Sequence, residues 1–283
     1  MAASSTLAVT GATGVVGGLV ARDLAARGLK QRLLVRTPVK APQLDGSAVH
    51  QLAYGDRAAA LAALEGVETL FMVSAAESAD RLDQHRTFID AAAEAGVQHV
   101  VYTSFVAAAP DAVFTLARDH FATEEHIRAS GMRWTFLRDS FYIDFMEALV
   151  GDDGVIRGPA GEGRVAVVAR ADVARTAATI LAAPAEHDGR TYELTGPEEL
   201  SLTEVAAIIS SVRGTDVTYL DETLDEAYAS RAGYGAPDWQ VDAWVSTYTA
   251  IASGDMATVS RDIETITAVA PRSLGTYLRD TPR

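Results

Sequence analysis

The sequence predicts an α/β fold, a doubly wound parallel sheet with a smaller, mostly helical C-terminal lobe. Short apolar segments alternate with amphipathic helical segments through the first half of the 283 residues, which is typical of βαβ units. One of these strand segments, Arg32–Arg36, has three apolar residues at its centre, as expected for a strand buried on both faces. A glycine-rich turn between the first strand and the first helix is the third observation.

That turn lies within Leu7–Gly17, which reads L-A-V-T-G-A-T-G-V-V-G. Glycines stand at Gly11, Gly14 and Gly17, and an amphipathic helix pattern follows over Val15–Gly28. The first N–H groups of a helix have no partner in the chain, and the helix dipole adds partial positive charge there. Strand, turn and helix in this order predict a site for the pyrophosphate of a dinucleotide. The alternative is an ordinary strand-to-helix turn.

The end of the second strand indicates which dinucleotide binds. In sites that prefer NAD, an acidic residue about 20 positions after the glycine turn holds the ribose 2′-hydroxyl. This chain has Arg36 at that strand end, with Lys40 close behind and no acid. Because a guanidinium suits a 2′-phosphate, the sequence favours NADP(H) over NAD(H). A solvated basic loop is the alternative.

The remaining strands and helices of the sheet follow in turn. Strands are expected at Val49–Tyr54, Val67–Ser74, Val97–Ser104 and Trp134–Arg138, and helices at Ala58–Leu64, Leu82–Ala95 and Leu116–Ser130. The small residues Ser74, Ala75 and Ala76 lie at the carboxyl end of the fourth strand. There they would let a dinucleotide lie against the backbone.

Beyond Asp139 the alternation weakens. Gly151–Gly163 contains five glycines and one proline and is expected to be an exposed loop region. Strands are expected at Val165–Val168 and Thr191–Thr195, and helices at Asp172–Ala183, Leu202–Arg213, Asp225–Arg231, Asp238–Ile251 and Arg261–Ala268. We therefore expect a dinucleotide-binding domain of residues 1–140 plus about 165–196, a substrate-binding lobe of about 141–164 plus 197–283, and a cleft between them.

The composition excludes several classes of protein. A net charge of −14 argues against a nucleic-acid partner, because phosphate binding needs clustered Lys and Arg. The absence of cysteine excludes disulfides, thiolate metal sites and cysteine nucleophiles. No apolar run approaches the roughly 18 residues of a membrane span, and Met1–Thr6 lacks the basic start of a secretion signal. We expect a cytoplasmic protein with no membrane partner.

Several motifs together resemble the NmrA-like atypical short-chain dehydrogenases. They are T-G-A-T-G-x-x-G, V-R-T-P-x-K, V-V-Y-T-S, L-A-R-D-H-F-A-T-E, T-F-L-R-D-S-F-Y-I-D-F, A-R-A-D-V-A and T-Y-E-L-T-G-P, in the order of the family, and the resemblance extends from Leu7 to about Leu278. Within the family, the triphenylmethane reductases and the NADPH-dependent quinone oxidoreductases are the most similar. The run at Phe141–Phe145 particularly resembles the triphenylmethane reductases.

This resemblance implies a Rossmann domain, NADPH at the carboxyl edge of the sheet, an aromatic electrophile as substrate, and a monomer, with a homodimer as the alternative. The residues that it implies in cofactor contact are Gly11, Ala12, Thr13, Gly14, Val15, Val16, Arg36, Ser74, Ala75, Ala76, Asp139, Ser140, Phe141, Tyr142, Ile143 and Asp144. At the first position of the last turn, relatives often have Asn and this chain has Asp139. That departure places an acid beside a polyanionic cofactor.

The residues for the usual short-chain dehydrogenase chemistry are missing. That chemistry uses Tyr-x-x-x-Lys, in which the lysine lowers the tyrosine pKa. The only lysines are Lys30 and Lys40, so no such pair exists. His120 and Glu124 are four residues apart, but no third metal ligand is apparent, and Ser104 has no visible base for a nucleophilic role. We therefore assign no catalytic residue and no metal.

Hydride transfer to an acceptor that is already electrophilic needs no strong protein acid, because positioning and exclusion of water supply most of the effect. We thus predict an NADPH-dependent reductase of a quinone or a similar aromatic compound, such as a triphenylmethane dye. The expected substrate contacts are Ser104, Phe105, His120, Phe141 and Tyr142. The alternatives are a non-catalytic regulator that senses NADP(H), and an epimerase or imine-type reductase with an unrecognised acid.

Overall fold

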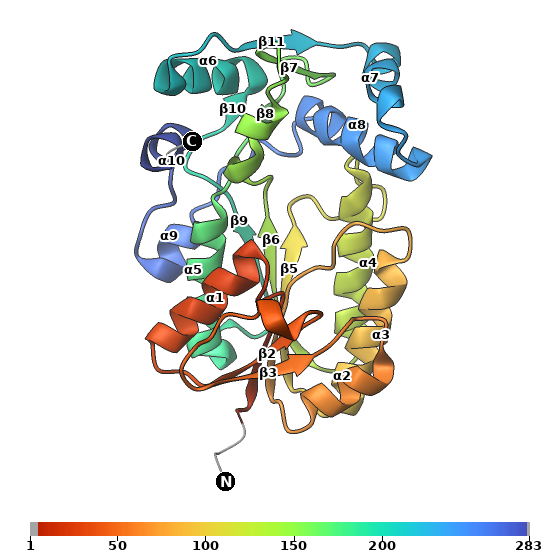
Figure 1. The fold of residues 1–283 in the computed structure, drawn as a ribbon, viewed down its shortest axis with the longest axis vertical. Coiled ribbons are helices and arrows are strands. Elements are labelled where there is room, and N and C mark those ends of the chain that lie inside the picture. Colours follow the sequence, from red (N-terminus) through yellow and green to blue (C-terminus); the bar gives the residue numbers. More distant parts are fainter. Residues whose placement is uncertain (1–4, 282–283) are drawn as a thin grey trace. The chain divides into compact units, whose positions relative to one another are not determined.

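The computed structural model describes residues 5–281 and contains a seven-stranded parallel sheet in the order β3-β2-β1-β4-β5-β6-β9. The strands are β1 (Leu7–Thr10), β2 (Gln31–Val35), β3 (Ser47–Gln51), β4 (Thr69–Met72), β5 (His99–Phe105), β6 (Arg133–Asp139) and β9 (Arg190–Leu194). The helices that connect them are α1 (Val15–Ala26), α2 (Arg57–Leu64), α3 (Arg81–Glu94), α4 (Thr115–Ala129) and α5 (Arg170–Ala182). In Figure 1, α1 and α5 lie on one side of the strands and α3 and α4 on the other. The predicted fold class is confirmed.

The register explains why the central strands are apolar. Val9 of β1 lies opposite Leu33 of β2 and Phe71 of β4, and all three side chains are fully buried. Since neighbouring strands here are parallel, their carboxyl ends meet at one edge of the sheet. The segments that follow β1, β2, β4 and β5 therefore emerge together, and they carry most of the predicted site residues.

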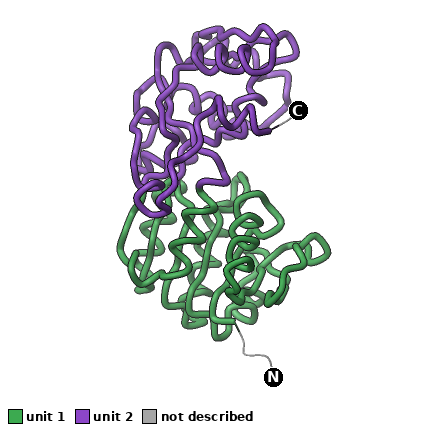
Figure 2. Tube along the Cα trace, turned by 90° about the vertical axis from the view of Figure 1, so that its left-hand side faces the viewer, with its two compact units in different colours: residues 1–104, 119–138, 173–192 green, residues 105–118, 139–172, 193–283 purple. Residues whose placement is uncertain are grey.

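The chain forms two compact units, each made of three segments. Unit 1 consists of residues 1–104, 119–138 and 173–192, and unit 2 of residues 105–118, 139–172 and 193–283 (Figure 2). The domain boundaries expected from the sequence stay a prediction, and their ends at residues 1–4 and 282–283 lie outside the described residues.

Unit 2 adds short strands and helices that the sequence predicted only in part. Its further strands are β7 (Val155–Gly158), β8 (Arg164–Val165), β10 (Leu200–Ser201) and β11 (Thr218–Asp221). Its further helices are α6 (Leu202–Arg213), α7 (Leu224–Arg231), α8 (Asp238–Ala252), α9 (Asp262–Thr267) and α10 (Leu274–Asp280). Short 3₁₀ turns lie at η2 (Ile143–Phe145), η3 (Glu147–Leu149) and η5 (Ala232–Tyr234) in this unit, and at η1 (Pro38–Lys40) and η4 (Pro184–His187) in unit 1. The sequence analysis missed α10, β7, β10 and β11.

The expectation of an exposed loop over Gly151–Gly163 is wrong. This stretch contains β7, which pairs in parallel with β11, and Ile156 is fully buried. A Cβ atom at Gly158 would lie 2.2 Å from the Tyr248 ring. Gly158 therefore allows the strand to pack closely against this ring, and it does not mark a flexible loop. The strand expected at Val165–Val168 is also shorter, because only Val165 belongs to β8 and Val168 instead forms an isolated bridge with Tyr142.

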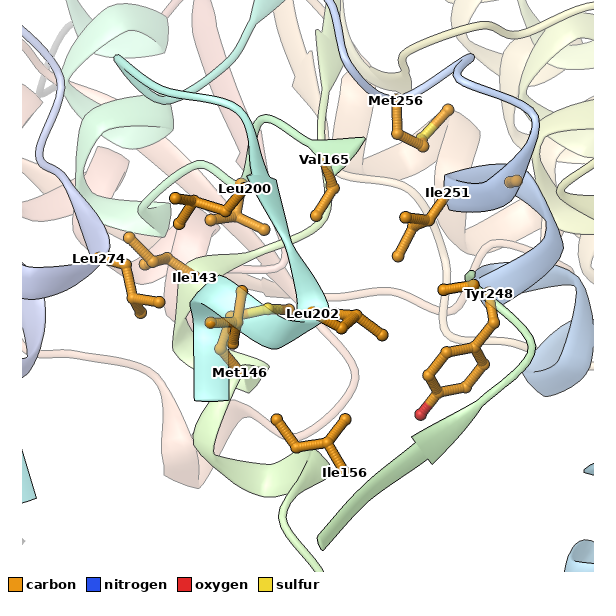
Figure 3. Close-up of a cluster of buried hydrophobic side chains, with 14 of the residues drawn as sticks. Ile143, Met146, Ile156, Val165, Leu200, Leu202, Tyr248, Ile251, Met256 and Leu274 are labelled. Carbon is orange, nitrogen blue, oxygen red and sulfur yellow. The ribbon is translucent and has the colours of Figure 1, made fainter. Parts of the chain in front are cut away.

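Each unit has its own apolar core. In unit 1 the core includes Phe88, Tyr102 and Phe136, all fully buried. In unit 2, residues from η2, β7, β8, β10, α8 and α10 converge on one cluster (Figure 3). Its labelled members are Ile143, Met146, Ile156, Val165, Leu200, Leu202, Tyr248, Ile251, Met256 and Leu274.

Candidate cofactor-binding site

The glycine turn is built by close backbone contacts. Gly11 has φ +65°, a conformation that favours glycine, and its carbonyl accepts the Gly14 N–H at 2.8 Å. At Gly17 a Cβ atom would lie 2.4 Å from the Gly11 carbonyl oxygen, so only glycine lets α1 pack this closely on the turn. Thr13, Gly14 and Val15 are exposed, whereas Ala12 and Val16 are buried.

The start of α1 is open to an anion. Its N-cap residue is Gly14, no side chain caps it, and no acidic residue lies in its first turn. The first N–H groups of this 12-residue helix have no partner within the helix, and the positive end of the helix dipole lies at the same place. This arrangement fits a phosphate and supports the predicted pyrophosphate site.

Arg36 follows β2, the strand next to β1. Its side chain is exposed, and none of the carboxylates within residues 5–281 forms an ion pair with it. Lys40 ends the 3₁₀ turn η1 that follows and is also exposed. The carboxyl end of β2 is therefore followed by two exposed cations, and the guanidinium of Arg36 suits a 2′-phosphate.

The loop Ser74–Ala76 is held by side chains from three elements. The Val73 N–H donates to Thr10 Oγ1 at 2.8 Å, and the Ser74 N–H donates to Thr103 Oγ1 at 2.9 Å. The Ala75 N–H then donates to His85 Nε2 at 2.8 Å, and Arg81 Nε donates to the Ala75 carbonyl at 3.0 Å. Ser74 and Ala75 stay half-buried, and Ala76 is exposed.

His120 lies in the same polar network and is 6% exposed. Arg81 Nη2 donates to its Nε2 at 3.0 Å, so the proton of the neutral ring is on Nδ1, which lies 3.0 Å from the Tyr102 hydroxyl. Burial, aided by the Arg81 charge, lowers the pKa of His120 well below its usual value. The substrate contact assigned to His120 stays a prediction.

Ser104 has a carboxylate partner that the sequence analysis did not find. Its hydroxyl donates to Glu124 Oε1 at 2.6 Å, and Glu124 is fully buried. Arg138 binds the same carboxylate through Nε at 2.9 Å and Nη2 at 2.8 Å. The spacing of Ala117, His120, Glu124 and Ile127 along α4 was an available signal, because it places polar groups on the buried face of a helix.

In unit 2, Phe105 and Phe141 are brought together by a third ring, Phe114. The three ring centroids are 4.8–5.1 Å apart, and Phe141 meets the other two edge to face. Phe105 and Phe114 are buried, and Phe141 is half-buried. Of these two predicted substrate contacts, Phe141 is therefore more exposed to solvent than Phe105.

The turn after β6 begins with a buried acid. The Tyr142 hydroxyl donates to Asp139 Oδ2 at 2.7 Å, while Asp139 Oδ1 and Ser140 Oγ have no hydrogen-bond partner among residues 5–281. Burial raises the pKa of Asp139 to about 8, although the hydrogen bond from Tyr142 by itself lowers this pKa. Asp139 is therefore mainly neutral at pH 7, which removes the expected clash of charge with a polyanionic cofactor.

The rest of this turn is fixed by backbone bonds and by Arg170. Ile143 N–H donates to the Val168 carbonyl at 2.9 Å, and the Ile143 side chain is buried in the core. Asp144 Oδ2 accepts the Arg170 N–H at 3.2 Å. The Arg170 guanidinium lies over the rings of Tyr142 and Phe145, at 4.9 and 4.0 Å from their centroids.

Within residues 5–281, no three side chains among His, Asp and Glu are grouped so that they could hold a metal ion. Among the helices of that same range, none has the length and apolar character needed to cross a membrane.

The parallel sheet with flanking helices, the glycine turn before a helix that no side chain caps, and the basic residue after β2 are together typical of a dinucleotide-binding protein of the Rossmann type. The chain belongs to the NmrA-like family, whose model matches residues 3–232. This confirms the family predicted from the sequence motifs.

Two proteins with similar sequences are named as oxidoreductases. The chain is 37% identical over 243 residues to quinone oxidoreductase 2 of Escherichia coli, covering 83% of this chain and 84% of that protein. It is 31% identical over 277 residues to an NAD(P)H azoreductase of Xenophilus azovorans, covering 96% of both.

Solved structures agree with these matches. The NADPH complex of an NADPH-dependent quinone oxidoreductase from Escherichia coli superposes with a TM-score of 0.88 and 32% identity, covering 97% of this chain and 99% of that one. The NADP(H) complex of the triphenylmethane reductase from a Citrobacter species gives 0.85 and 31%, covering 95% and 98%.

Proposed function

We propose that this protein is an NADPH-dependent oxidoreductase that reduces quinones or similarly electrophilic aromatic compounds. The observation that carries the proposal is the open start of α1, which follows β1, together with the exposed Arg36, which follows the neighbouring strand β2 and has no ion-pair partner among residues 5–281. These two features fit the pyrophosphate and the 2′-phosphate of NADPH. The related quinone oxidoreductase, azoreductase and triphenylmethane reductase support the same class of reaction.

NADPH, when bound, supplies a hydride. The substrate takes up that hydride and one proton from water, so a quinone becomes a hydroquinone and NADP⁺ is left. The aryloxide formed first is stable enough to wait for its proton, and the protein need only bind and orient both partners and exclude water. Phe141 and Tyr142 are the aromatic side chains that we assign to the substrate, with Ser104, Phe105 and His120 as further predicted contacts.

The test is turnover of NADPH, followed by the loss of its absorbance, with a panel of quinones, azo dyes and triphenylmethane dyes. We expect oxidation of NADPH with at least one class and a much higher KM with NADH. Tight NADPH binding without turnover across the whole panel would overturn the proposal and favour the NADP(H)-sensing regulator.

Location and assembly belong to the same proposal. The lack of cysteine supports a cytoplasmic protein. We assign a monomer, with a homodimer as the alternative, and light scattering of the purified chain with and without NADPH distinguishes the two.

A further inference from the structure

We propose that His85 and Arg81 are positioning residues for NADP(H), because together they hold the N–H and the C=O of Ala75 and so fix the loop that the cofactor lies against. This inference rests on the proposed function, which places the cofactor at Ser74–Ala76. It concerns two residues of α3 that the sequence analysis did not single out.

The first argument is the pattern of bonds as the chain leaves β4. Three successive N–H groups, those of Val73, Ser74 and Ala75, each donate to a side chain instead of a strand partner. The acceptors come from three different elements: Thr10 from β1, Thr103 from β5 and His85 from α3. Because every one of these bonds is made within unit 1, the backbone of the loop is held without any contribution from a ligand.

The second argument is the tautomer of His85, which is fully buried. Its Nε2 accepts the Ala75 N–H, so the ring proton is on Nδ1, which donates to Thr123 Oγ1 at 2.9 Å. The Thr123 hydroxyl in turn donates to the Asp119 carbonyl at 2.7 Å. Burial and the Arg81 charge lower the pKa of His85 to about 3, so Nε2 remains an acceptor over the physiological range.

The third argument is the position of Arg81, which is 4% exposed. Its Nε donates to the Ala75 carbonyl and its Nη2 to His120, while Asp119 Oδ2 lies 3.7 Å from its Nη1. Because a buried guanidinium is costly unless it is paired, these contacts with His120 and Asp119 keep Arg81 in place against the Ala75 carbonyl. Arg81 also fixes the proton of His120 on Nδ1, so the loop and this second histidine are set by one side chain.

The chain contains a matched control. His99 is also fully buried in unit 1, and its Nε2 lies 2.9 Å from Thr135 Oγ1, which donates onward to the His187 carbonyl. The substitutions His85→Phe and His99→Phe therefore remove the same kind of histidine–threonine bond. Only the first also leaves the Ala75 N–H without its acceptor.

The experiment measures the Kd for NADPH and the KM for a quinone in both variants, with thermal melting to check folding. We expect His85→Phe to raise the NADPH Kd by about 5- to 30-fold, as loss of a buried hydrogen bond predicts, and His99→Phe to change it by less than about twofold. The quinone KM at saturating NADPH should stay within about twofold in both variants. Amide exchange should show a protected Ala75 N–H in the wild type and a fast one in His85→Phe.

Two further variants keep the inference testable if His85→Phe does not fold. His85→Gln retains an acceptor for the Ala75 N–H and should restore the Kd to within about threefold of the wild type, whereas Arg81→Met should weaken NADPH binding as His85→Phe does. Equal Kd values for the His85 and His99 variants, or a failure of His85→Gln to rescue, would overturn the positioning role. A wild type that does not bind NADPH at all would instead overturn the proposed function.

Discussion

The Asp139 carboxyl group accepts one hydrogen bond, from the Tyr142 hydroxyl, and is otherwise enclosed without a cation beside it within residues 5–281. Because burial raises its pKa to about 8, the folded protein binds a proton that the unfolded chain releases near pH 4. The stability of the fold should therefore decrease as pH rises from about 4 to about 8.

The substitution Asp139→Asn tests this relationship, since an amide does not ionise. Relative to the wild type, the variant should gain up to about 1.4 kcal/mol in its free energy of unfolding for each pH unit between about 4 and 8. Urea unfolding across this range measures the gain, with Asp144→Asn in the same turn as control. Parallel pH profiles for wild type and Asp139→Asn would contradict the assignment of a neutral Asp139.

Arg36→Ala should weaken NADPH binding by roughly 1.5–3 kcal/mol, the range for hydrogen bonds to charged groups, and leave NADH binding almost unchanged. The guanidinium is exposed and has no carboxylate partner in the described chain, so no folded-state ion pair is lost. Titration of both cofactors into wild type and variant measures the difference, and Lys40→Ala serves as a neighbouring cation control. An equal loss for NADPH and NADH would rule out the 2′-phosphate contact.

Gly14→Val and Gly17→Val should fail in different ways. At Gly14 φ is −92°, and an added Cβ would meet only the Gly11 carbonyl oxygen, at 3.3 Å, so the fold should be retained while the branched side chain blocks the pyrophosphate. At Gly17 the same atom would lie 2.4 Å from that oxygen, so the strand–helix packing itself should break. Circular dichroism separates the two, and normal NADPH binding by a folded Gly14→Val would refute the glycine-turn site.

Tyr142→Phe should lower kcat/KM for a quinone by about 3- to 30-fold, well short of the roughly 100- to 10,000-fold expected for loss of a general acid. The reason is that the Tyr142 hydroxyl already donates to Asp139, and the aryloxide product can take its proton from water. Steady-state kinetics measure the ratio, with Tyr228→Phe, an exposed tyrosine of α7, as control. A loss above a thousandfold at unchanged NADPH affinity would indicate a true catalytic acid.

Glu124→Gln should destabilise the fold by about 3–5 kcal/mol, because it leaves the Arg138 guanidinium without its buried carboxylate. Glu125→Gln is the matched control, since Glu125 is exposed and its ion-pair partner is Arg128, so its effect should be below about 1 kcal/mol. Urea unfolding at neutral pH compares them. Similar losses in the two variants would show that the Arg138 pair contributes little.

The sequence was informative wherever one periodic pattern determines burial. The strands of the sheet and helices such as α6, predicted and found at Leu202–Arg213, follow from local apolar spacing and caps. The glycine turn and Arg36 were predictable for the same reason, because each lies directly after a strand.

Side-chain partners were not predictable in this way. Ser104 and Glu124, or Ala75 and His85, meet only once α4 and α3 pack on the sheet, and nothing in their spacing sets which polar groups face each other. The prediction of an exposed loop at Gly151–Gly163 was wrong for a related reason. Its glycines suggested an open loop, but the constraint at Gly158 is the Tyr248 ring, which comes 90 residues later.

The division into six alternating segments has a practical consequence for anyone who wishes to cut or recombine this chain. The polypeptide passes from one unit to the other five times, after residues 104, 118, 138, 172 and 192. No single truncation therefore separates one unit from the other: a fragment ending at residue 192 keeps all of unit 1 but also carries two segments of unit 2. A fragment ending at residue 138 would lack the third segment of unit 1, including most of α5, and would carry only the first segment of unit 2.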